Sequence, residues 1–382
     1  MSHYTEVLTA HRRALHQIPE LSFQEFKTTE YIRSELTKLG LSYLSPLETA
    51  TVVYLEGNSS KTIGFRADID ALPVDEETDV PFLSGHSGAM HACGHDGHTS
   101  MLLTFAEWCK NQQDQQQLKH NVLLIFQPSE ESNAGANALI KAFPFEDYDL
   151  EAIFALHLGP DTKEGAILTK EGPLMASATE YRIAIKGRSA HVAEKETGAN
   201  ALGALSHTVN QIAQIQQYAL SGLNQNVLHI GKMSAGEAIN TVASNGYLEG
   251  TIRTYDPADL KTILQKIETI LTSSDQIYGT TSTLTVAEGY PPVINPESLL
   301  PLVENSATAA GLDIIWKTKP YLYGEDFSFY AQVVPTHFAF LGIRNEEKGY
   351  TSGLHTSTFN FDESILLNGV RYYQEILNQI GE

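Results

Sequence analysis

The feature that most constrains the fold of this chain is a series of apolar runs of β type, each followed by residues that could bind a metal ion or carry a proton. These runs and their following residues are 61–66 with Asp68 and Asp70, 121–126 with Glu130 and Glu131, and 152–156 with His157. Helical segments lie between the runs, so we expect an α/β fold with a mostly parallel sheet flanked by helices. Because ligands bind outside the carboxyl ends of the strands in such sheets, these side chains should meet in one crevice.

Composition and charge bound the class of protein. The chain has 382 residues, 42% of them hydrophobic, which is enough for a packed core and for two domains. The chain has a net charge of −21, so the phosphates of nucleic acid and an anionic membrane would repel it. Two cysteines, Cys93 and Cys109, do not indicate a disulfide framework, and the N-terminus has no signal-peptide pattern. We therefore expect a cytoplasmic protein that binds neither nucleic acid nor a membrane.

The pattern changes near residue 173, which predicts an inserted domain. Residues 179–187 alternate between apolar and polar, as in a strand with one exposed face. Helical periodicity over 200–220, two strand-like runs, a helix after Asp256 and a closing strand give the order β-α-β-β-α-β of a ferredoxin-like unit. We expect a catalytic domain formed by residues 1–173 and 291–382, with the ferredoxin-like domain inserted as residues 174–290.

Five side chains have the chemistry of transition-metal ligands: Cys93, His95, Glu131, His157 and His355. Cys93 and His95 are two residues apart and can face one ion from an extended loop. Each group alone is more often structural, for example as a small core cysteine or a hydrogen-bonded histidine. Together they exceed what one tetrahedral ion requires, and they predict a site for two metal ions with shared or open positions.

Carboxylates beside these ligands predict roles in proton transfer and in orienting the ligands. Glu130 and Glu131 are adjacent on a loop and can point in different directions, so one can bind metal while the other faces the substrate as a general base. Asp68 and Asp70 share one face if their strand continues, and such carboxylates commonly orient a ligating histidine. The alternative interpretation is structural. Glu130 and Glu131 would then belong to an ordinary acidic loop, and Asp68 and Asp70 would be turn-forming residues before Pro73.

Two other hypotheses use the same residues. In the first, Cys93 is a nucleophile and His95 or His157 is its base, which leaves Glu131 and His355 without roles. In the second, the chain is a metal-dependent binder of a small molecule or peptide, without catalysis. Glu130 argues against this second hypothesis, because a binding protein needs no general base there.

Longer motifs resemble those of a known family. They are RADIDALP (66–73), MHACGHDGH (90–98), QPSEE (127–131), GRSAH (187–191), GTIR (250–253), GEDFS (324–328) and HTSTFNFDE (355–363). Over nearly its whole length the chain is similar to the aminoacylase/carboxypeptidase family of dinuclear metallopeptidases. Within it, the chain most resembles hippurate hydrolases, N-acyl-amino-acid deacetylases and indole-acetyl-amino-acid amidohydrolases.

The resemblance implies a metal-dependent amidohydrolase that cleaves N-acyl amino acids or related small amides, with a dipeptidase or carboxypeptidase acting on short peptides as the alternative. It implies that the five ligands named above hold two divalent ions, manganese, zinc or nickel. Glu130 would be the general base, and Asp70 would orient a ligand.

The resemblance also implies a homodimer formed through the inserted domain. In that domain His191 would stabilise the oxyanion, and Asn240 and Arg253 would hold the carboxylate of the substrate. Residues 192–196, which follow His191, are VAEKE, whereas this branch has Ala-Ala-x-Pro-His at this place. The resemblance therefore does not predict which acyl group the enzyme prefers.

Overall fold

The computed structural model describes residues 2–381 and divides the chain into two compact units. The first unit runs up to Leu174 and includes Ile294–Pro320 and the chain from Asp326 onward. The second unit contains Met175–Val293 and Tyr321–Glu325. The sequence pattern places residues 321–325 in the catalytic domain, which is wrong for this segment. These residues group with the second unit because their backbone pairs there, where the N–H of Ala176 donates to the carbonyl of Tyr321 (3.1 Å).

A seven-stranded sheet forms the centre of the first unit. Its strands, in spatial order, are β1 (Thr51–Leu55), β3 (Asn121–Gln127), β2 (Thr62–Asp68), β4 (Leu150–Lys163), β13 (Thr336–Arg344), β5 (Ile167–Thr169) and β12 (Ile314–Trp316). The four strands β3, β2, β4 and β13 are parallel to their neighbours in that order, while β1 and β5 pair antiparallel with β3 and β13. The predicted mostly parallel sheet is therefore confirmed.

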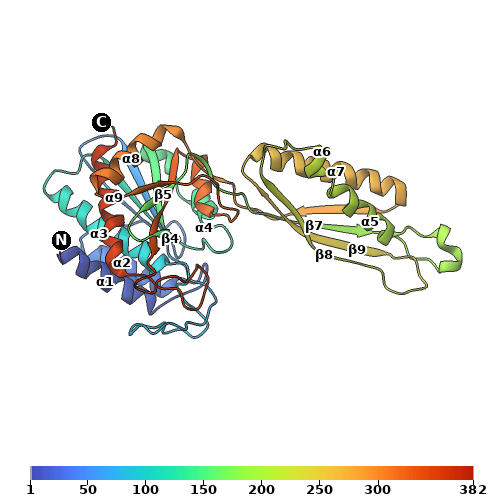
Figure 1. The fold of residues 1–382 in the computed structure, drawn as a ribbon, viewed down its shortest axis with the longest axis horizontal. Coiled ribbons are helices and arrows are strands. Elements are labelled where there is room, and N and C mark those ends of the chain that lie inside the picture. Colours follow the sequence, from blue (N-terminus) through green and yellow to red (C-terminus); the bar gives the residue numbers. More distant parts are fainter. Residues whose placement is uncertain (1, 382) are drawn as a thin grey trace. The chain divides into compact units, whose positions relative to one another are not determined.

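Helices flank this sheet (Figure 1). They are α1 (Ser2–His16), α2 (Phe26–Lys38), α3 (His95–Asp114), α4 (Gly135–Ala142), α8 (Leu300–Ala309) and α9 (Leu366–Gln379), with 3-10 helices η1 (Phe145–Tyr148), η3 (Glu297–Leu299), η4 (Asp326–Gln332) and η5 (Glu363–Ile365). Helix α3 packs on β2, β3 and β4, and α9 packs beside α3. Every residue of β2 and β3 is buried, as expected for strands covered on both faces. No helix in the described part of the chain has both the length and the apolar character needed to cross a bilayer.

The strand that carries His157 differs from the expectation. The apolar run in the sequence ends at Leu156, but β4 continues to Lys163, so His157 lies in the middle of the strand. The extension is stabilised by β13, which pairs with β4 along both halves. On its other side β4 pairs with β2 only as far as Ala155. His157 therefore lies just beyond the end of β2, at the same edge as the loops that follow β2 and β3.

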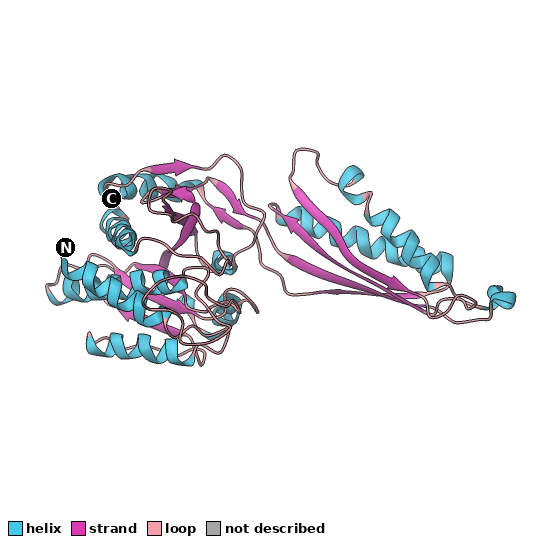
Figure 2. Ribbon diagram, turned by 60° about the horizontal axis from the view of Figure 1, so that its bottom comes forward, coloured by secondary structure: helices cyan, strands magenta, loops and turns pink. Residues whose placement is uncertain are grey.

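The second unit is a four-stranded antiparallel sheet with helices on one face (Figure 2). Its elements are β7 (Thr179–Lys186), η2 (Val192–Thr197), α5 (Ala201–Ile212), α6 (Ile215–Tyr218), β8 (Asn226–Ala235), β9 (Asn245–Thr254), α7 (Pro257–Tyr278) and β10 (Thr281–Val286). Alternate residues of β7 are buried against the helices, as the sequence pattern predicts. Asp256 caps α7 by accepting the N–H of Ala258 (2.8 Å). The sheet order β10-β7-β9-β8 with two helical crossings is a ferredoxin-like topology. Two short strands, β6 (Gly172–Met175) and β11 (Val293–Asn295), form a separate pair.

Candidate metal centre

The loops after β2 and β3 and the start of α3 bring the predicted metal-binding side chains together in the first unit. The ligand atoms of Cys93, His95 and Glu131 all lie within 4.8 Å of one another. His157 joins them through its Nε2, which is 3.4 Å from the Sγ of Cys93. His355 joins them through its Nε2, 3.4 Å from the Oε1 of Glu131. All five side chains therefore line one site, although His355 is half exposed and the others are largely buried.

Hydrogen bonds set the tautomers of two of these histidines. The Nδ1 of His95 is 2.9 Å from the carbonyl oxygen of Asp70, and the Nδ1 of His157 is 2.8 Å from that of Leu158. A carbonyl only accepts, so each Nδ1 carries the proton and donates it. Each Nε2 then presents a lone pair to the centre of the cluster, which is the arrangement in which imidazole binds a metal.

The cluster has more negative than positive charge. Burial raises the pKa of the Cys93 thiol well above its usual value, and the nearby carboxylates of Glu131 and Glu130 raise it further. In the absence of a cation, burial lowers the pKa of His95, but Asp68, Asp70 and Glu131 outweigh it and raise this pKa to about 10, so a metal ion that binds Nε2 would displace a proton from it. A thiolate in such surroundings requires a nearby cation, and a divalent metal supplies one.

Two buried atoms in the cluster have no hydrogen-bond partner among the described residues. They are the Nε2 of His95 and the Oε1 of Glu131. Leaving such atoms unpaired costs about 1–3 kcal/mol each, unless another group binds them. Thiol, imidazole and carboxylate are together a typical ligand set for zinc-like ions, so these residues fit a metal site.

A second set of ligand-type side chains, Asp68, His95, His98 and His157, lies beside the first. Both ring nitrogens of His98 are already engaged in it. Its Nδ1 is 2.6 Å from the Oδ1 of Asp68, and its Nε2 accepts the backbone N–H of Leu158 at 2.9 Å. His98 therefore has no lone pair left for an ion, and its bonds stabilise the junction between α3 and β4.

Asp70 holds the loop that carries the two glutamates. Its Oδ1 accepts the backbone N–H of Glu130 (3.1 Å), and its Oδ2 accepts that of Glu131 (3.0 Å) and the hydroxyl of Ser22 (2.8 Å). Its Oδ1 is also 3.3 Å from the Nδ1 of His95. Asp70 thus contacts the ring of His95, one of the predicted ligands, and in addition holds the backbone of the glutamate loop.

The remaining predicted residues lie in the second unit. His191 is exposed at the start of η2, where its Nδ1 accepts the N–H of Ala193 (3.1 Å), so its Nε2 carries the proton. The N–H of Val192 donates to the carbonyl of Asn240 (3.0 Å), which places Asn240 on the segment beside His191. Arg253 lies one residue before the end of β9 and is half-buried.

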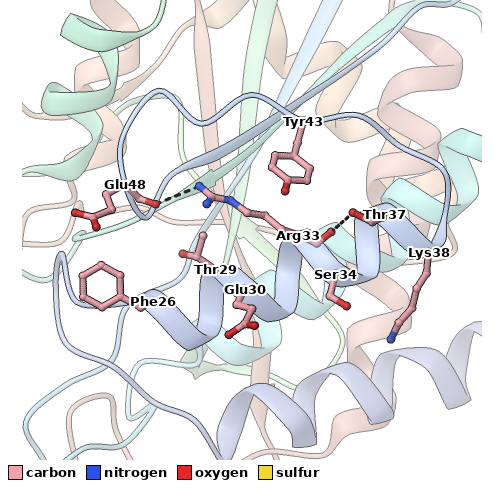
Figure 3. A pocket seen from close by; sticks show the side chains of 9 residues that line it. All are labelled: Phe26, Thr29, Glu30, Arg33, Ser34, Thr37, Lys38, Tyr43 and Glu48. Carbon is pink, nitrogen blue, oxygen red and sulfur yellow. Dashed lines mark hydrogen bonds between the residues drawn. The ribbon is translucent and has the colours of Figure 1, made fainter.

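An open surface pocket of about 640 Å³ over α2 is a separate feature of the first unit (Figure 3). Its lining contains no cysteine or histidine. Its guanidinium group, on Arg33, already donates to the carbonyls of Glu48 and Ala50 and to the hydroxyl of Thr51. The pocket therefore lacks the thiol and imidazole ligands that the metal centre contains.

Several residues that contact the carboxylates and the loops of the site were not expected from the sequence. Arg66 is buried and pairs with Asp68 (2.6 Å) and Asp326 (2.9 Å). Ser22 and Glu25, from the loop between α1 and α2, reach Asp70 and the backbone of Ser129. For Arg66 a signal existed, since a charged residue inside an apolar strand run requires a buried partner. Ser22 and Glu25 lie in the connection between α1 and α2, and no sequence pattern distinguishes them there.

Comparison with known proteins gives consistent matches over the whole chain. Residues 64–379 match Peptidase family M20/M25/M40. The chain is 52% identical to the uncharacterized hydrolase SH1513 of Staphylococcus haemolyticus and 51% identical to the uncharacterized hydrolase SAB1253 of Staphylococcus aureus, over 99% of each chain. The crystal structure of the Bacillus subtilis YXEP protein, described as a dinuclear metal binding peptidase from the M20 family, matches 99% of both chains with a TM-score of 0.84 and 30% identity. The chain therefore belongs to peptidase family M20/M25/M40 and is a hydrolase of that family.

Proposed function

We propose that this hydrolase is a dinuclear metal-dependent amidohydrolase that cleaves the amide bond of N-acyl amino acids or related small amides. The observation that carries the proposal is the convergence of Cys93, His95 and Glu131, in which two buried ligand atoms have no hydrogen-bond partner within residues 2–381. The motifs around these residues resemble the branch that contains hippurate hydrolases and N-acyl-amino-acid deacetylases, which supports this substrate class.

Five residues would hold the ions: Cys93, His95, Glu131, His157 and His355. Manganese, zinc and nickel each suit this mixture of thiolate, imidazole and carboxylate. When bound, the ions would polarise the amide carbonyl and lower the pKa of a water molecule. The half-exposed His355 gives the site one wall that can admit a substrate.

Glu130 would act as the general base. It follows β3 on the same loop as Glu131, and Asp70 accepts the backbone N–H groups of both residues, so the backbone that carries the two side chains is held in place. Glu130 would take a proton from the attacking water and pass it to the leaving amine.

The second unit would supply the groups that bind the substrate. His191, protonated at Nε2, is a suitable donor to an oxyanion. Arg253 and Asn240 would hold the free carboxylate of the amino acid, because a guanidinium binds a carboxylate through two parallel hydrogen bonds. We expect a homodimer formed through this unit, in the cytoplasm, with no nucleic acid or membrane partner.

A short peptide is the second candidate substrate, and the description of the B. subtilis protein as a peptidase favours it. A cysteine nucleophile is a weaker alternative. Burial and the nearby carboxylates raise the pKa of Cys93, which disfavours the thiolate that such a reaction needs.

Release of free amine from a panel of N-acetyl amino acids, N-benzoyl amino acids and dipeptides tests the proposal. The protein would be stripped with a chelator and then reconstituted with manganese or zinc. Turnover that returns only with metal supports the metal-dependent hydrolysis, and the preferred substrate separates the amidohydrolase from the peptidase. Full activity after verified metal loss would contradict the mechanism, and metal binding without turnover of any amide would favour a binding protein.

A further inference from the structure

The loop of residues 128–134, which presents Glu130 and Glu131, has an unusual backbone. Three of its residues other than glycine have positive φ: Ser129 (59°), Asn133 (65°) and Ala134 (50°). Gly135 closes the loop, and a Cβ there would lie 1.8 Å from the carbonyl oxygen of Pro128. Left-handed backbone costs free energy in residues with a side chain and persists only where the surroundings impose it.

Two buried carboxylates impose this conformation through three consecutive backbone N–H groups. Asp70 accepts those of Glu130 and Glu131, as described above. The Oε1 of Glu25 accepts the preceding one, from Ser129, at 2.9 Å. The hydrogen bond from Ser129 joins segments 104 residues apart in the sequence and fixes the loop immediately before the glutamate pair.

The carboxylate of Glu25 binds the loop of residues 128–134 and does not cap the helix that follows Glu25. Glu25 directly precedes α2, at the N-cap position, yet its side chain makes no capping hydrogen bond. Instead, its Oε1 receives the N–H groups of Phe23 (2.9 Å) and Ser129 in a fully buried site. Burial and the neighbouring Asp70 raise the pKa of Glu25 to about 7. Burying this carboxylate beside another costs free energy, and the hydrogen bond from Ser129 offsets part of that cost only while the loop keeps its conformation.

We infer that Glu25 is a positioning residue: its carboxylate fixes the backbone of the loop that presents Glu130 and Glu131 to the reaction centre. The inference rests on the proposed function for the roles of those two glutamates. The Oε1 of Glu25 accepts the backbone N–H of Ser129, so Glu25 acts on the loop through this peptide unit.

Three variants of the full-length chain test the inference. Glu25→Ala removes the acceptor, while Glu25→Gln keeps an oxygen that can accept the N–H of Ser129. Glu20→Ala is the matched control, because Glu20 lies on the same connection and also accepts a backbone N–H, that of Thr28 (3.0 Å), rather than one from the loop. Amide hydrogen exchange of residues 128–134 would be followed in metal-free and Mn²⁺-loaded protein, and Mn²⁺ affinity would be measured by competition with a chelator.

We expect Glu25→Ala to accelerate exchange in residues 128–134 and to weaken Mn²⁺ binding by about 10–100-fold, the usual effect of losing a group that orients a ligand. Glu25→Gln should show the exchange rates and the Mn²⁺ affinity of the wild-type protein. Glu20→Ala should accelerate exchange only at the start of α2. Unchanged exchange and affinity in Glu25→Ala, or equal effects of Glu20→Ala, would overturn the inference. If the wild-type protein hydrolyses no amide, the proposed function fails, whereas exchange and affinity still decide the role of Glu25.

Discussion

The Nε2 of His95 and the Oε1 of Glu131 lie 3.8 Å apart, and although both atoms are buried, neither has a hydrogen-bond partner in the part of the chain that the structure describes. Zinc binds imidazole nitrogen and carboxylate oxygen at about 2.0–2.2 Å, so two atoms that share one ion lie within about 4 Å of each other. The spacing of the two residues is therefore compatible with a common ion.

Metal removal should destabilise the first unit, because these two buried atoms lose the group that would bind them. A ligand that binds only the folded state stabilises it by about 2.7 kcal/mol at 100 times its dissociation constant. Thermal unfolding with increasing Mn²⁺ or Zn²⁺ should therefore show a rising midpoint. Glu131→Gln should show a much smaller rise, and an identical rise in wild type and variant would contradict the assignment of Glu131 as a ligand.

The adjacent glutamates should differ in what their loss removes. Glu130→Gln should lower kcat by about 10²–10⁴, the usual effect of a general base, with the bound metal retained. Glu131→Gln should instead weaken metal binding. Metal content by elemental analysis and kcat at saturating metal separate the two effects. Loss of metal in Glu130→Gln, with normal metal content in Glu131→Gln, would reverse the two assignments.

Local patterns predicted the parts of the fold and site that depend on neighbouring residues. The polar residues after β2 and β3 pointed to one edge of a parallel sheet, and the Cys93–His95 spacing pointed to one loop. The position of His157 inside β4 was not predictable, because it depends on where the neighbouring strand β2 stops pairing. The contact of Glu25 with Ser129 was not predictable either, since no local pattern links segments so far apart.

His98 shows why the motif alone cannot assign the ligands. It lies in the same short segment as Cys93 and His95, but Asp68 and the backbone of Leu158 use both of its nitrogens. We therefore expect His98→Ala to lower the free energy of unfolding by about 1–3 kcal/mol through buried groups left unpaired. The number of metal ions bound per chain should not change. Elemental analysis and denaturant unfolding would check this, and loss of one ion in His98→Ala would show that His98 is a ligand.

A buried histidine in α1 should make stability depend on pH. Burial lowers the pKa of His16, but its hydrogen bonds with Asp96 (2.7 Å) and Glu76 (3.1 Å) outweigh burial and raise the pKa from 6.5 to about 9. A pKa raised by folding means that the folded state binds the proton more tightly. The stabilisation, about 3 kcal/mol, is complete below pH 6.5 and is lost as the pH rises through about 9.

This dependence on His16 can be separated from other titrations by substitution. Urea unfolding of the metal-free protein between pH 6 and 9.5 should show a fall in the free energy of unfolding that His16→Gln reduces, while the part due to His95, whose pKa is also raised, remains. His3→Gln, at an exposed position of the same helix, is the control and should keep the fall. An equal fall in His16→Gln and wild type would mean that another group causes it. The ion pairs of His16 with Asp96 and Glu76 would then contribute little at neutral pH.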